Sequence, residues 1–226
     1  MSDTACVLKQ RQEATDLLNI GSYEAAEPLL RNILEKTSEL HNAETFMWKR
    51  RLAECLLGQE KYAEAAKLAR SATKEFGRYD ASDEDSLDCK YFLAECLYGQ
   101  KKVNDAVDVA QAALAALKAN VSRGPEHVTT LKCSALLAVL LQAQNKVVEA
   151  KEIAESTAEC LEAVIQKEEI LASQGSRRPT SYDRIALFKV KGFIGAVLKD
   201  GGKLHGKKDD DSLSQCSTRL PSKETR

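Results

Sequence analysis

The chain has 226 residues, of which 43% are hydrophobic and 5% aromatic, so it can bury a core but lacks the aromatic residues that a β-sandwich favours. Its 33 lysines and arginines nearly cancel its 34 aspartates and glutamates, which argues against nucleic acid or an anionic membrane as a partner. The start shows no basic segment followed by an apolar run, and the longest apolar run, 135–141, is too short to span a bilayer. We therefore expect a cytoplasmic protein.

The seven cysteines are dispersed and fall mostly at apolar positions of predicted helices. None belongs to a CxxC or CxxH pair, the spacing that zinc sites use. We interpret them as small buried hydrophobic residues in a reducing compartment, and we predict neither a metal nor a cofactor.

One pattern of residues occurs four times, with spacings of 39, 41 and 44 residues between the turn residues Tyr23, Tyr62, Val103 and Val147. Alanine stands three residues after each turn residue and nine before it, and leucine stands six before it. Small residues at fixed helical positions let two backbones approach closely, with leucine filling the adjoining groove. The repetition predicts helical hairpins that stack on one another.

In chain order, the periodicity predicts first helices near 6–19, 44–58, 85–99 and 127–143 and partner helices near 22–38, 61–76, 102–119 and 146–173. These pair into repeats near 6–38, 44–76, 85–119 and 127–173. A further apolar stripe predicts a capping helix over 181–200 that covers the flank of the fourth hairpin. We thus predict a repeat domain over 1–200. Residues 201–226 contain few apolar residues and are predicted to be a disordered tail.

The order of small residue, leucine, turn, aromatic residue and alanine resembles the tetratricopeptide repeat. The long spacing, with Gly124-Pro125-Glu126-His127 before Leu136-Leu137-Ala138 and then 144–150, is most similar to the long-period repeats of kinesin light chain. This resemblance implies an all-α, right-handed solenoid of four hairpins and a role in protein binding. The chain departs from it because the tryptophan position is unfilled, alanine replaces glycine, and no proline closes the repeats. The paired asparagines that bind a cargo backbone in light-chain repeats are also absent.

Stacked hairpins place their first helices along a concave wall, so groove candidates are the first-helix residues that packing does not claim. Because tyrosine and arginine dominate interface energetics, we predict protein binding through a subset of them. This subset comprises Arg11, Arg50, Glu54, Tyr91, Glu95 and Tyr98. The remaining candidates are Thr15, Leu18, Met47, Leu57, Asp88, Lys132, Ala135, Val139 and Gln142. The alternative is that any of these residues is solvated or contacts its own repeat.

No catalytic constellation accompanies the repeats. His41, His127 and His205 lie near predicted loops or the tail without a matching nucleophile or carboxylate, and no glycine-rich phosphate loop is present. The sequence therefore predicts a non-catalytic interaction module, a scaffold or adaptor that binds a peptide or a partner helix. The alternative is a structural subunit that self-associates or docks permanently into a larger assembly, such as a cargo or motor adaptor similar to kinesin light chain.

Overall fold

The computed structural model describes residues 3–37, 43–76, 84–121, 124–174 and 181–200, and these residues form helices and the turns that join them. The predicted tail, His41 and His205 lie outside the described residues. The helices are α1 (Asp3–Asn19), α2 (Tyr23–Thr37), α3 (Ala43–Gly58), α4 (Tyr62–Phe76), α5 (Glu84–Gly99), α6 (Val103–Ala119), α7 (Val128–Ala143), α8 (Val147–Ser173) and α9 (Ser181–Asp200).

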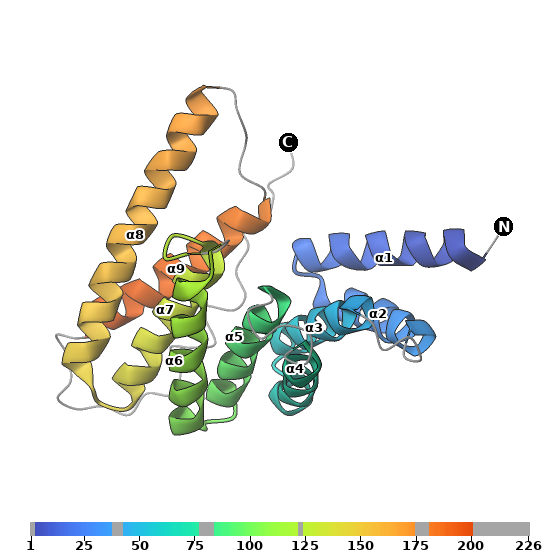
Figure 1. Ribbon diagram of the computed structural model, residues 1–226, viewed down its shortest axis with the longest axis horizontal. Coiled ribbons are helices and arrows are strands. Elements are labelled where there is room, and N and C mark those ends of the chain that lie inside the picture. The colour runs from blue at the N-terminus through green and yellow to red at the C-terminus, as the bar shows by residue number, and fades with distance from the viewer. Residues whose placement is uncertain (1–2, 38–42, 77–83, 122–123, 175–180, 201–226) are drawn as a thin grey trace, which may run out of the picture.

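The helices pair into four hairpins that follow one another from right to left in Figure 1, with α9 lying across the last of them. The all-α repeat architecture predicted from the sequence is thus confirmed. Within the described ranges, no helix combines the length and apolarity needed to cross a membrane.

The four hairpin turns share one backbone conformation. Two residues before each turn residue stands a residue with positive φ; in the second turn it is Glu60, with φ 60°. The backbone N–H of Lys61 donates to the carbonyl oxygen of Leu56 at 2.9 Å, and that of Glu60 donates to Leu57 at 3.0 Å. This pair of bonds is the Schellman motif, which satisfies the last carbonyls of a helix. The other positive-φ turn residues are Gly21, Lys101 and Asn145.

The recurring alanines are packing residues, as the repeated pattern predicted. The alanines of the first helices and those of the second helices are all 0% exposed, so each hairpin closes over small side chains at its centre. One continuous hydrophobic cluster extends from α1 to α9. The alanines are Ala14, Ala53, Ala94 and Ala138 in the first helices and Ala26, Ala65, Ala106 and Ala150 in the second.

Helix α9 packs differently from the first helices that precede it in the chain. Each of α3, α5 and α7 packs mainly against the second helix of the preceding hairpin or of its own, whereas α9 packs more extensively against α7 than against α8. Its buried face, which includes Leu187, Val190, Ile194 and Val197, therefore lies largely over the inner helix of the fourth hairpin. The predicted cap is present, but it turns toward the concave side.

Candidate functional site

All four first helices contribute to one cavity of about 280 Å³ on the inner side of the array. This arrangement agrees with the predicted placement of the first helices along one wall. The cavity is polar and charged, as a surface that recognises a hydrophilic partner requires. Its walls are Leu18 and Asn19 of α1, Arg50, Arg51 and Glu54 of α3, Asp88 of α5, and His127, Val128, Thr129 and Lys132 at the start of α7.

Arg50 links α3 to α5 beside this cavity. Its Nε lies 3.0 Å from Oδ1 of Asp85, and its Nη1 lies 3.6 Å from Oδ2 of Asp88. Burial by itself would lower the pKa of Arg50, but Asp88, Glu54 and Asp85 raise it above its usual value. The guanidinium therefore stays charged and holds two neighbouring hairpins together.

Other predicted site residues are also paired within the chain. Arg11 of α1 forms an ion pair with Glu44 of α3, and Glu95 of α5 forms one with Lys189 of α9. The side chains of Arg11 and Glu95 are 24% and 8% exposed, whereas those of their partners Glu44 and Lys189 are 37% and 43% exposed. A binding partner would have to break these pairs to use the charge of Arg11 or Glu95. Arg11 and Glu95 thus act first as ties between helices.

Tyr91 differs from the prediction that packing leaves it available. Its side chain is 0% exposed, and the ammonium of Lys132 lies 4.6 Å from its ring centroid. The neighbouring Phe92 ring lies 5.4 Å from it, tilted by 59°. The face of α5 that the register assigned to the groove is therefore closed at this point by α7, and Tyr91 belongs to the core.

Tyr98 is half-buried against the core and does not line the cavity, and burial raises the pKa of its phenol. Of the predicted binding residues, Arg50 and Glu54 are the two that the structure brings together at the cavity. Whether they contact a partner stays a prediction.

Trp48 lies at the junction of the first two hairpins and is 4% exposed. The guanidinium carbons of Arg11 and Arg51 lie 6.0 Å and 5.7 Å from its ring centroid. These stacking contacts fix the orientation of Arg51 where it enters the cavity wall.

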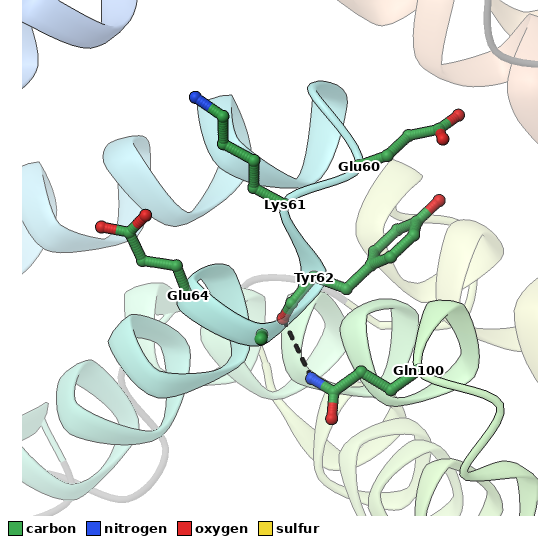
Figure 2. A pocket seen from close by; sticks show the side chains of 6 residues that line it. Glu60, Lys61, Tyr62, Glu64 and Gln100 are labelled. Atoms are coloured by element: carbon green, nitrogen blue, oxygen red, sulfur yellow. Dashed lines mark hydrogen bonds between the residues drawn. The ribbon is translucent and has the colours of Figure 1, made fainter.

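A second, more open depression of about 420 Å³ lies at the turn between α3 and α4, next to the end of α5. Figure 2 shows Glu60, Lys61, Tyr62, Glu64 and Gln100 around it, with the amide of Gln100 donating to the backbone oxygen of Tyr62 at 3.0 Å. Because its central amide is used to join two hairpins, we assign this depression to packing rather than to recognition.

Five cysteines of the described helices are free thiols, and four of these are buried, as expected of small core residues. Burial raises the pKa of Cys55 to about 11 and those of Cys96 and Cys133 to about 12. These three thiols stay protonated at neutral pH and are poor nucleophiles. No group of three or more metal-ligating side chains occurs in the described part of the chain.

Comparison with known proteins shows which repeat fold the chain resembles. A family model described as anaphase-promoting complex, cyclosome, subunit 3 matches residues 19–113, from the end of α1 into α6. A crystal structure of the nearly identical TPR-like repeats of a Podosopora anserina protein assigned as a kinesin light chain covers 89% of this chain and 96% of its own, with TM-score 0.59 and 18% identity. The hairpins have the TPR-like repeat fold of this structure. The crystal structure of a point variant of the same protein matches with TM-score 0.61 and 16% identity, covering 89% of this chain and 95% of its own. No curated protein matches the chain.

The sequence pattern missed half of the cavity wall. Asn19, Arg51, His127, Val128 and Thr129 were not among the predicted groove residues, whereas Leu18, Arg50, Glu54, Asp88 and Lys132 were. His127 was expected near a loop at the start of the helix predicted over 127–143. It is the N-cap of α7, and its Nδ1 accepts a hydrogen bond from the backbone N–H of Thr129 at 3.1 Å. The preceding turn, Gly124-Pro125-Glu126, is the signal that predicted a helix start here, but it did not indicate that His127 would line the groove.

Proposed function

We propose that this chain is a non-catalytic protein-interaction module that binds a segment of a partner protein along its first helices. The observation that carries the proposal is the single cavity to which all four first helices contribute charged or polar side chains. Its free thiols fit the reducing cytoplasm, where we place the protein.

The cavity limits how a partner would enter. A helix with its side chains is about 10–12 Å across, whereas a space of about 280 Å³ accommodates one or two side chains. Because α9 covers the inner face of α7, we place the partner segment over α1, α3 and α5, with a side chain reaching the start of α7.

The test compares two valine substitutions. Val128→Arg adds a long, charged side chain to the cavity wall, whereas Val148→Arg changes a residue that is 72% exposed at the start of α8. We expect Val128→Arg to abolish selection of binding peptides from a randomised displayed library, and Val148→Arg to retain it. Circular dichroism and melting temperature must be the same for both variants. Peptides that bind wild type and Val128→Arg equally would contradict a groove site.

A second function, as a subunit that docks into a larger assembly, is favoured by the far end of α8. This 27-residue helix extends well beyond its partner α7, as Figure 1 shows, and Ile170 and Leu171 near its end are 56% and 45% exposed. If this end mediates self-association, light scattering should report a mass above that of the monomer, and Ile170→Lys should restore the monomer mass. A concentration-independent monomer in the wild type argues against self-assembly.

A further inference from the structure

Helix α9 repeats, on its exposed side, the residues by which the first helices contact their own second helices. The set consists of a large apolar residue, a small residue seven positions later and a leucine three positions after that. In α9 these are Phe188, Gly195 and Leu198, which we call the hairpin face of α9. The counterparts are Phe46, Ala53 and Leu56 of α3, Leu87, Ala94 and Leu97 of α5, and Leu131, Ala138 and Leu141 of α7.

In α3, α5 and α7 this set is buried, whereas in α9 it is open to solvent. Each of the three earlier helices packs against the second helix of its own hairpin, and none of the counterpart residues is more than 4% exposed. Phe46, for example, clusters with Ala72 of α4. Phe188 is 77% and Leu198 is 40% exposed, and nothing lies within 4 Å of a β-carbon added to Gly195. The described residues therefore leave the hairpin face of α9 uncovered.

A polar residue in the same register marks where a second helix lies. It stands three positions after the large apolar residue. In α3 it is Lys49, whose Nζ lies 2.8 Å from Oε2 of Glu75 in α4. In α7 it is Ser134, whose hydroxyl oxygen lies 2.7 Å from that of Thr157 in α8. In α9 it is Lys191, which is exposed and makes no ion pair with a described residue, so it lacks the partner that a second helix would supply.

Gly195 fits the same interpretation. Glycine inside a helix is less favourable than alanine, and within the described chain no close contact requires it at this position. A helix seated on the hairpin face would bring its backbone close to Gly195, as the second helices do at the alanines of the four hairpins.

The composition of the chain indicates that a different protein supplies this helix. Residues 201–226 contain few apolar residues and have glycine at positions 201, 202 and 206, so their sequence lacks the apolar stripe of a second helix. In a second copy of the chain, the recurring alanines of the second helices are 0% exposed against their own first helices. Such a helix would have to leave its hairpin before it could pair with α9.

We propose that α9 is an unpaired first helix that binds an amphipathic helix of a partner protein and so completes a fifth hairpin between two chains. The partner helix carries a small residue facing Phe188 and, three residues later, an acidic residue facing Lys191. Ala72 and Glu75 have these two roles in α4. The surface is separate from the groove cavity, whose wall includes no residue of α9. The inference therefore goes beyond the proposed groove function and does not depend on it.

The probe for this surface is a fluorescent peptide of residues 62–76, because α3, the partner of this helix, has the same phenylalanine and lysine as α9. A hydrocarbon cross-link between positions 63 and 67, which are exposed in α4, keeps the peptide helical, since an isolated helix of 15 residues is marginal in water. Fluorescence polarisation measures its binding to the full chain. We expect saturable binding that weakens roughly tenfold with Phe188→Lys. The melting temperature should stay the same, because Phe188 is exposed.

A charge exchange tests the seating of the helix directly. Lys191→Glu should weaken binding of the probe roughly fivefold, and a probe that carries Glu75→Lys should bind this variant better than it binds wild type. Lys102→Glu, at an exposed position before α6, is the control and should bind both probes as wild type does. Recovery by the exchanged probe separates a helix seated in this register from nonspecific adhesion to an apolar patch.

Three results would overturn the proposal. The first is the absence of probe binding. The second is binding that Phe188→Lys leaves unchanged, as expected if the peptide replaced α4 against α3. The third is a wild-type mass above that of the monomer in light scattering that Phe188→Lys returns to the monomer mass, because a second copy would then occupy the face. Val128→Arg should leave probe binding unchanged, so the groove function and the hairpin face can fail independently.

Discussion

The ring of Tyr62 occupies the space that a side chain on Gly99 would need. A β-carbon built at position 99 would lie 2.4 Å from Cδ1 and 2.6 Å from Cγ of Tyr62, far inside van der Waals contact. The first turn of α4 is thereby seated on the last residue of α5, so the second hairpin fits closely against the third. Tyr23 and Gly58 form the equivalent contact between the first two hairpins.

Replacing Gly99 with alanine should therefore destabilise the protein by about 1–3 kcal/mol, because the ring must leave its position. Chemical denaturation measures this change. Gly192→Ala is the matched control, since nothing lies within 4 Å of its added β-carbon, and alanine should stabilise that exposed site by about 0.5–1 kcal/mol. A Gly99→Ala protein as stable as wild type would show that the ring contact is loose.

Ala94→Arg tests the central packing of the array. Ala94 is 0% exposed on α5, so arginine would bring a charge and a long side chain between packed helices. We expect a loss of about 4 kcal/mol or more and of the cooperative thermal transition followed by circular dichroism. Ala112→Arg changes an exposed alanine on α6 and should alter stability by less than about 0.5 kcal/mol. A soluble Ala94→Arg protein with wild-type melting would refute the proposed packing register.

Asp88→Asn tests whether the carboxylates beside Arg50 hold two hairpins together. The Arg50 side chain is 14% exposed, and removing the charge of Asp88 leaves Asp85 as its nearest carboxylate. We expect a destabilisation of about 1–3 kcal/mol, below the full cost of orphaning a buried charge, because one partner remains. Urea unfolding checks the value, with the exposed Asp108→Asn as control. Equal stability of the two variants would mean that Asp85 alone suffices.

Glu27 makes the stability of the fold depend on pH. The pKa of its carboxyl group is lowered from 4.5 to about 2, mainly by the hydrogen bond from Lys61. Partial burial opposes this shift, and hydrogen bonds from Arg31 and Gln59 add to it. A carboxylate with a depressed pKa stabilises the fold above pH 4.5, and this contribution disappears as the pH falls through 2. Because Lys61 and Arg31 are each 46% exposed, solvent screening reduces the contribution of the Glu27 carboxylate to the free energy of unfolding to about 1 kcal/mol.

We therefore expect Glu27→Gln to be less stable than wild type at pH 7, with the difference shrinking toward zero near pH 2. Denaturant titrations across this range provide the measurement, and the exposed Glu24→Gln variant on the same helix is the control. A difference that is constant with pH would exclude the ionised carboxylate as its cause.

Much of the fold was predictable because its packing residues recur. Alanine at two fixed positions per hairpin identified the buried contacts, and each predicted helix boundary lies within three residues of the observed one. The glycine that faces each turn tyrosine could also have been predicted from the sequence, but it was missed. Gly58 and Gly99 each stand four residues before a turn residue, and each faces the tyrosine at the turn of the preceding hairpin. The turn residue of the third hairpin, Val103, is smaller than tyrosine, and the corresponding position of the fourth hairpin is Ala143.

The site was less predictable, because repeat register assigns a residue to a face but not to a neighbour. Tyr91 and Lys132 were both assigned to the groove, yet the ammonium of one covers the ring of the other. Similarly, the apolar stripe of α9 predicted a cap without indicating that α7 would receive most of its contact. Such pairings depend on how successive hairpins are rotated, which no single-hairpin pattern encodes.

The inward turn of α9 also sets how such an array could grow. A helical repeat lengthens by seating a new first helix against the last second helix, and here α9 lies over the fourth hairpin with its contact directed to α7. At this end of the array, a duplicated hairpin would therefore have to enter between existing ones. At either of the first two junctions it would need to match a tyrosine on one side with a glycine on the other, so side-chain size constrains the order of the hairpins there.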